Sequence, residues 1–140
     1  MPEMIITVSD VTSAELTKAL EEGLDAATPH ALKRNYRPLV IEARSPSGEL
    51  LGALSGSTYW SWLHTRLLWV HPSVRGIGLG GQLMGRAEQE ARGRGCVSAL
   101  VDTFSFQAPG FYEHLGYVAF ARLQDFPPGE QRIYLKNSLV

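Results

Sequence analysis

Apolar residues recur at helical spacing in two parts of the chain. Residues 12–15, Thr-Ser-Ala-Glu, form a capping box, and leucines at every fourth position follow it: Leu16, Leu20 and Leu24. This pattern predicts an amphipathic helix that ends before the Thr-Pro-His sequence at 28–30. The same four-residue spacing over residues 79–91 predicts a second helix with one buried face, which Gly93 and Gly95 end.

Shorter apolar runs outside these segments predict strands. They cover residues 5–8, 39–43, 50–59, 62–70, 97–101, 117–123 and 131–139. A turn is expected at 45–48, and a short helix over 108–115, because Pro109 falls in its first turn and Gly116 follows it. The resulting order is β-α-β-β-β-α-β-α-β-β. It predicts an α/β or α+β protein in which helices pack on a sheet.

The length and composition indicate one folded domain over residues 1–140. At 15.4 kDa the chain can bury a core, and 44% hydrophobic with 19% charged residues is ordinary for a globular protein. A net charge of -1 argues against non-specific nucleic-acid binding, and no apolar run approaches the roughly 18 residues of a membrane span. The first ten residues lack a cationic segment followed by an apolar one, and a single Cys96 excludes an internal disulfide. We therefore expect a cytoplasmic protein in which Cys96 is a small buried residue rather than a nucleophile.

A glycine-rich segment is the strongest candidate for chemistry. It lies between the apolar run 67–70 and the second predicted helix, and it consists of Arg75, Gly76, Ile77, Gly78, Leu79, Gly80 and Gly81. Glycine lets the backbone approach a ligand closely, and a helix N-terminus adds unpaired N–H groups and a partial positive charge. The segment therefore predicts a cradle for a phosphorylated ligand.

Three kinds of phosphate site compete for this segment. A P-loop is excluded, because no Gly-Lys-Ser/Thr follows the glycines. The spacing does satisfy the dinucleotide fingerprint G-x-G-x-x-G, and Asp102 lies about 20 residues further on, where a ribose-binding acid belongs. Against it, residues 71–75 separate the strand from the first glycine, and fewer than forty residues remain after Asp102 to complete a doubly wound sheet.

The third interpretation rests on two motifs in the expected order. The first is Arg75-x-x-Gly78-x-Gly80, preceded by Leu68-x-Val70-x-Pro72. The second is Ala108-x-x-Phe111-Tyr112-Glu113-x-x-Gly116-Tyr117. Together they resemble the two signatures of the GCN5-related N-acetyltransferases, from about residue 50 to 139, and 102–109 looks like a bacterial subgroup of small members.

This resemblance implies a single-domain fold with a mixed, mostly antiparallel sheet of six or seven strands, splayed in the middle and flanked by helices. It also implies acetyl transfer from acetyl-CoA to a primary amine of a small molecule or a peptide Lys, by direct attack in a ternary complex and without a metal. The backbone of Leu68, Trp69 and Val70 would pair with the pantetheine arm, and a homodimer would be common for the family. An acyl-CoA-binding regulatory module without turnover remains the alternative of a different class.

The resemblance also assigns residues to roles. Tyr112 is the expected general acid for the thiolate, since a phenol with a pKa of about 10 stays protonated at neutral pH. Ser105 replaces an Asn that touches the CoA arm in the family, so Ser105 or Gln107 would make that contact. The general base is less defined: Asp102 is the first candidate, followed by the two histidines His71 and His64. The aromatic residues near the third predicted strand, with His64, would form an acceptor pocket or a dimer contact: Tyr59, Trp60 and Trp62.

Overall fold

The computed structural model describes residues 3–140, and the chain divides into two compact units, with the boundary in the sequence between Arg34 and Asn35. The first unit contains the helix α1 (Ala14–Ala27) and a short 3-10 helix, η1 (His30–Leu32). The Ser13 hydroxyl accepts the Leu16 N–H at 3.1 Å, which confirms the predicted helix start. The strand predicted at residues 5–8 is wrong: this run is exposed and joins no sheet, because four residues form a strand only when a neighbour takes up their N–H and C=O groups. That both units form one domain stays a prediction.

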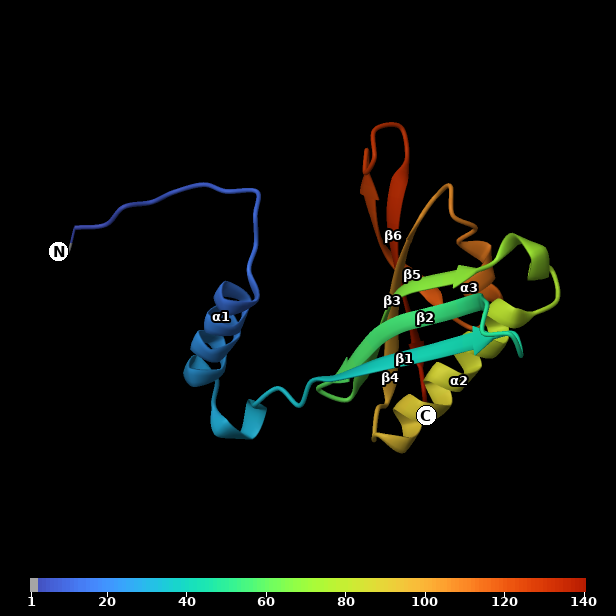
Figure 1. The fold of residues 1–140 in the computed structure, drawn as a ribbon, viewed down its shortest axis with the longest axis horizontal. Coiled ribbons are helices and arrows are strands. Elements are labelled where there is room, and N and C mark those ends of the chain that lie inside the picture. Colours follow the sequence, from blue (N-terminus) through green and yellow to red (C-terminus); the bar gives the residue numbers. More distant parts are fainter. Residues whose placement is uncertain (1–2) are drawn as a thin grey trace. The chain divides into compact units, whose positions relative to one another are not determined.

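The second unit is built around one six-stranded sheet (Figure 1). Its strands are β1 (Arg37–Arg44), β2 (Leu50–Tyr59), β3 (Trp62–Val70), β4 (Ser98–Phe104), β5 (Val118–Gln124) and β6 (Gln131–Ser138). They lie in the order β1-β2-β3-β4-β6-β5, and only the β3–β4 pair is parallel. The expectation of a mixed, mostly antiparallel sheet is confirmed.

One face of the sheet is covered by the helix α2 (Leu79–Gly93), which lies along β1, β2 and β3 (Figure 1). The predicted stripe is confirmed, since Leu83, Ala87 and Ala91 are buried. They pack against apolar side chains that alternate along the strands: Leu39, Leu54, Leu63, Val101 and Leu135. Alternation places the intervening residues of the same strands on the opposite face.

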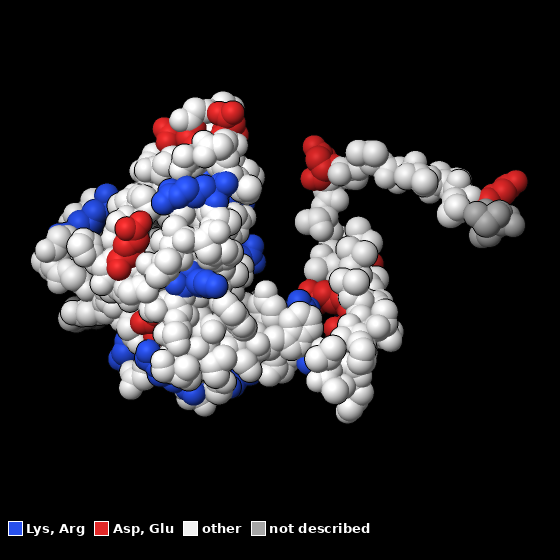
Figure 2. Space-filling view, turned by 180° about the vertical axis from the view of Figure 1, so that it is seen from behind, with Lys and Arg blue, Asp and Glu red and all other residues white. Residues whose placement is uncertain are grey.

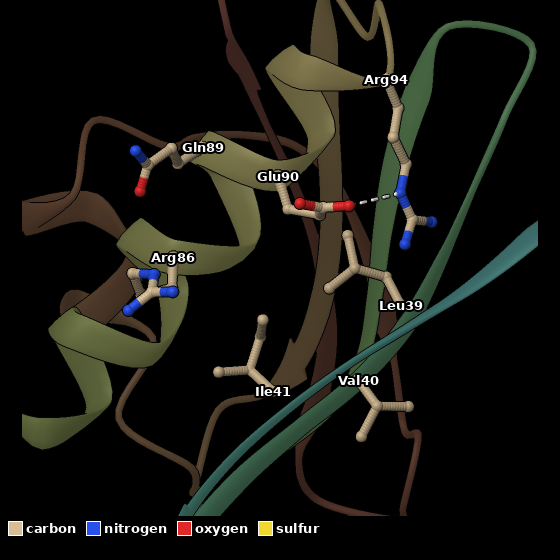
Figure 3. Close-up of a pocket in the computed structure, with 7 residues that line it drawn as sticks. All are labelled: Leu39, Val40, Ile41, Arg86, Gln89, Glu90 and Arg94. Carbon is tan, nitrogen blue, oxygen red and sulfur yellow. Dashed lines mark hydrogen bonds and ion pairs between the residues drawn. The ribbon is translucent and has the colours of Figure 1, made fainter.

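Between α2 and the edge strand β1 lies a cavity of ≈ 420 Å³ (Figure 3). Leu39 and Ile41 point toward the helix, whereas Val40 points away from it. Arg94 fixes the end of α2, because its guanidinium donates to Glu90 Oε1 at 3.1 Å and to Pro38 O at 3.0 Å. The charged side chains that line this cavity thus serve to hold the end of α2 against β1.

The β3–β4 pair separates after a few residues. Pairing runs only from Trp62 with Ser98 to Thr65 with Val101, although β3 continues to Val70. At this point β3 contains a bulge at Arg66, since Thr65 pairs with Gly56 and Leu67 with Ser55. A Cβ on Gly56 would clash with the His64 carbonyl, so the bulge requires glycine there. The predicted splay is confirmed, and it begins at Arg66, so residues 68–70 of β3 lie beyond the last pair with β4.

The bulge leaves one buried hydroxyl without a partner. Thr65 is 3% exposed, and within residues 3–140 its Oγ1 is the one buried side-chain N or O atom without a hydrogen-bond partner. We expect Thr65→Val to keep the free energy of unfolding unchanged or raise it by about 1 kcal/mol, because the variant removes an unsatisfied polar group. Urea denaturation measures this. The control Thr103→Val should instead lose about 1 kcal/mol, since Thr103 Oγ1 donates to Gln107 O at 3.3 Å.

Charge is spread over the sheet unit. Figure 2 shows its Lys and Arg side chains at several separate places on one face, with acidic side chains between them. Across residues 3–140, the helices are too short or too polar to cross a membrane.

Candidate active site

The glycine-rich segment connects β3 to α2. A one-turn 3-10 helix, η2 (Pro72–Val74), comes first, and Gly76 and Gly78 follow with φ of +79° and +84°. The first bond of α2 joins the Gln82 N–H to Gly78 O, so the N–H groups of residues 79–81 have no acceptor within the helix. Apart from the glycine and its two chain neighbours, no protein atom lies within 4 Å of where a Cβ on Gly76 or Gly78 would stand. The turn therefore offers both the donors and the space that a phosphate needs.

Other residues of this segment serve the fold. A Cβ on Gly80 would come within 3.2 Å of the Phe111 ring, so this glycine lets the next helix approach α2. Arg75 is exposed, and its Nε donates to Val70 O at 3.0 Å. That bond holds the guanidinium beside the start of the turn. His71 Nδ1 accepts the Ser73 N–H at 3.0 Å, and Nε2 lies 3.7 Å from Glu49 Oε1.

Tyr112 lies on the short helix α3 (Gly110–His114). The helix begins two residues later than predicted because Ala108, with φ of +46°, forms a left-handed turn. Tyr112 contacts the ring of Phe111 at 5.0 Å and that of Tyr117 at 6.0 Å between centroids. The Tyr117 hydroxyl donates to Glu88 Oε2 at 2.9 Å, so the neighbouring phenol already has a structural partner.

A polar cavity of ≈ 230 Å³ opens at the splay between β3 and β4. It is lined by Arg66, Leu67, Leu68, Asp102, Thr103, Gln107 and Tyr112. The structure thus brings three predicted site side chains together: the proposed acid, the first candidate base and Gln107. Burial and the negative charge of Asp102 raise the pKa of Tyr112, so its phenol keeps its proton at neutral pH.

Ser105 is tied to the β5–β6 hairpin instead. Its hydroxyl donates to Glu130 and accepts the Gln131 N–H at 2.9 Å. Because these two bonds use the hydroxyl, Gln107 is the better placed of the two residues to replace the missing Asn.

Asp102 is held by an arginine that the motifs do not include. Arg132 donates from Nε at 2.9 Å and from Nη2 at 2.6 Å to Asp102 Oδ2. The other carboxylate oxygen, Oδ1, lies 3.8 Å from His64 Nε2. The Arg132 guanidinium also lies 5.0 to 5.6 Å from three ring centroids, those of Phe126, Tyr134 and Phe104. Arg132 was missed because its link to Asp102 spans 30 residues and follows only from the β4–β6 register.

His64 lines a second, apolar cavity of ≈ 300 Å³ on the face of the sheet opposite α2. The other lining residues are Tyr59, Trp60, Trp62, Leu100 and Phe120. The structure therefore brings the predicted aromatic cluster and His64 to one cavity, and it adds two residues from other strands. Burial lowers the pKa of His64, helped by the charges of Arg66 and Arg132 and opposed by Asp102.

The remaining predicted residues have simpler surroundings. Trp69 packs its ring against His71, with centroids 5.7 Å apart, and Ile77 is exposed on the turn. Cys96 is buried, as expected, and burial raises the pKa of its thiol. Within residues 3–140, no three His, Cys, Asp or Glu side chains gather as a metal site would require.

Three features define the class of this enzyme: the fold, the separation of β3 from β4, and the glycine turn that follows β3. The chain belongs to the acetyltransferase (GNAT) family, whose model matches residues 7–117. It is therefore an N-acetyltransferase, which confirms the predicted family and enzyme class. The dinucleotide alternative is excluded, because one parallel strand pair does not make a doubly wound sheet.

Relatives carry the same description. The chain is 48% identical to blasticidin-S acetyltransferase of Streptomyces morookaense over 97 residues, 66% of this chain and 71% of the relative. It is 34% identical over 135 residues to an acetyltransferase of Agrobacterium fabrum, covering 96% and 98% of the two chains. The crystal structure of an acetyltransferase from Bacillus cereus matches 97% of each chain with a TM-score of 0.82 at 27% identity.

A further structure with this fold contains acetyl coenzyme A. It is a protein of Bacillus anthracis described as a streptothricin acetyltransferase and crystallised with acetyl coenzyme A. Its TM-score is 0.64 at 19% identity, over 72% of this chain and 62% of that protein.

Proposed function

We propose that this enzyme transfers the acetyl group of acetyl-CoA to a primary amine of a small molecule, by direct attack within a ternary complex. The observation that carries the proposal is the polar cavity at the splay, because Tyr112 and Asp102 both line it where β3 and β4 separate. The turn with the left-handed Gly76 and Gly78 leads out of the same strand, β3. A thioester held between the strands would thus have its phosphates at the turn.

The donor would be held mainly by backbone groups. The N–H groups at residues 79–81 and the dipole of α2 would bind the pyrophosphate, with Arg75 beside them. Beyond Arg66, β3 has no ladder to β4, so residues 68–70 would offer backbone groups to the pantetheine arm as an added strand would. Gln107 would contact that arm from the wall of the cavity.

The reaction must remove two protons from the acceptor. An alkylammonium first gives one proton to a base, and the free amine then attacks the thioester carbonyl. As the C–S bond breaks, Tyr112 protonates the departing sulfur and recovers a proton from the new amide nitrogen. A protonated phenol suits this role, and the burial of Tyr112 keeps it protonated.

The acceptor side would be the face of the sheet opposite α2. The 48% identity to blasticidin-S acetyltransferase supports a small-molecule amine, and blasticidin S is the first acceptor to try. The aromatic cavity beside His64 has room, at ≈ 300 Å³, for the body of such a molecule.

The test is the consumption of acetyl-CoA, followed as free thiol, with blasticidin S and with a panel of other primary amines. We expect thiol release that depends on the amine, together with a product heavier by one acetyl group. Thiol release at the same rate without any amine would contradict the proposal, since it would show hydrolysis alone.

Trp62 provides a separate test of the acceptor side. Its side chain is 38% exposed and lines the aromatic cavity. Trp62→Ala should raise KM for the acceptor about tenfold, because a stacked ring contributes roughly 1 kcal/mol beyond its area. The KM for acetyl-CoA should stay unchanged in steady-state assays. Val40→Ala, an exposed apolar residue on β1, is the control and should change neither constant.

A further inference from the structure

We propose that His64 is the general base that takes the proton of the acceptor ammonium, and that Asp102 and Arg132 are the residues that position it. This assignment rests on the proposed acetyl transfer to an amine. The role of base is thus assigned to His64 instead of Asp102, which was the first candidate from the sequence.

The contacts of Asp102 argue against its acting as the base itself. Its Oδ2 accepts two N–H groups of Arg132, at 2.9 and 2.6 Å, and its side chain is only 16% exposed. Protonating this carboxylate would cost the ion pair with Arg132. A fixed carboxylate beside a histidine instead orients the ring and stabilises the imidazolium that forms.

The position of His64 suits proton transfer. It pairs with Leu100 across the β3–β4 ladder, one step before the strands separate, and it shares the face of the sheet opposite α2 with Asp102. Its ring lines the aromatic cavity, while Asp102 lines the polar cavity with Tyr112. His64 therefore faces the proposed acceptor side and lies 3.8 Å from Asp102, which shares the polar cavity with the group that would take the second proton, Tyr112.

The second candidate from the sequence, His71, has both ring nitrogens in other contacts. Nδ1 accepts the Ser73 N–H and lies 2.7 Å from the Ser73 hydroxyl, and Nε2 lies 3.7 Å from Glu49. These contacts stabilise the entry to the glycine turn, which belongs to the donor side.

The charges around His64 favour a neutral ring at pH 7. Asp102 on β4 faces the ring, and Arg66 lies two residues further along β3. Arg132 and Lys136 lie on β6, two strands away from His64: Arg132 is hydrogen-bonded to Asp102, and Lys136 is on the same face of the sheet. Burial is the largest influence and lowers the pKa of His64 below 6.5, so the ring can accept a proton at neutral pH. The ammonium proton passes to His64, the amine attacks, and His64 later releases its proton to solvent.

The experiment is the pH profile of kcat/KM for the wild type and two variants. The wild type should lose activity below an apparent pKa lower than 6.5. His64→Gln should lose about 10²-fold or more at pH 7, and its activity should keep rising with pH toward the amine's own pKa of about 10. Asp102→Asn should keep the acidic limb but move it to lower pH, because the carboxylate raises the pKa of His64. His114→Gln, an exposed imidazole on α3, should keep the wild-type profile.

Two results would overturn the assignment. The first is a wild-type acidic limb in His64→Gln that disappears in Asp102→Asn, which would make Asp102 the base. The second comes from NMR titration of the His64 ring, which needs no turnover: a midpoint above 7, or one that does not fall in Asp102→Asn, would contradict the proposed environment. A wild type that consumes acetyl-CoA at the same rate with and without an amine would instead reject the proposed function, whatever the titration shows.

Discussion

Tyr112→Phe is expected to lower kcat for acetyl transfer by about 10²- to 10³-fold, the usual contribution of a positioned general acid. The substitution removes one oxygen and keeps the ring, so the packing against Phe111 and Tyr117 should survive. The KM for acetyl-CoA should change little, because the proposed donor contacts come from the turn and from the β3 backbone. Steady-state kinetics with the acceptor at saturation measure both constants.

Tyr117→Phe is the matched control for this variant. Tyr117 is 2% exposed, and its hydroxyl donates to Glu88 rather than lining the polar cavity. Losing that buried bond should cost roughly 1 to 3 kcal/mol of unfolding free energy and leave kcat near the wild-type value. If Tyr112→Phe turned over as fast as Tyr117→Phe, Tyr112 would have no part in the proton transfer.

The parts of the site that the sequence could predict are local in the chain. The glycine turn and the start of α2 lie within residues 75–81, and Tyr112 lies between a proline and a glycine that set the limits of a short helix. Such segments carry their conformational preferences in their own residues. The buried face of α2 was predictable for the same reason, since the four-residue spacing of its apolar residues is visible without knowing which strands the helix packs against.

The parts that could not be predicted depend on strand register. Whether Asp102 faces Arg132 or a neighbour follows from the pairing of β4 with β6, and the distance from His64 to Asp102 follows from the pairing of β3 with β4. No pattern within a single strand determines that register. The start of the splay is a further case: the bulge at Arg66 needs the glycine at position 56, on another strand. The Asp102–Arg132 ion pair and the short distance from His64 to Asp102 together change the proposed base from Asp102 to His64.

Gly78→Val is expected to weaken coenzyme A binding by roughly a hundredfold or more while leaving a folded protein. The valine would move the phosphate away from its N–H donors, and hydrogen bonds to a charged group are worth about 1.5 to 3 kcal/mol each. Gly78 precedes α2 with φ of +84°, and the space where its Cβ would stand is empty of protein atoms. A valine there would put three carbon atoms where the proposed phosphate lies, and it would strain the left-handed backbone by about 1 to 2 kcal/mol.

Backbone strain alone could lower affinity, so the variant needs a control that carries the same strain elsewhere. Gly95, after the other end of α2, has φ of +85° and equally open surroundings. Gly95→Val should therefore lose a similar free energy of unfolding and still bind coenzyme A as the wild type does, measured by calorimetry and by the rise in Tm with ligand. Equal affinity in the two variants would mean that the turn holds no phosphate. A loss confined to Gly78→Val would mean that the empty space at the start of α2, and not the stability of the helix, is what the donor requires.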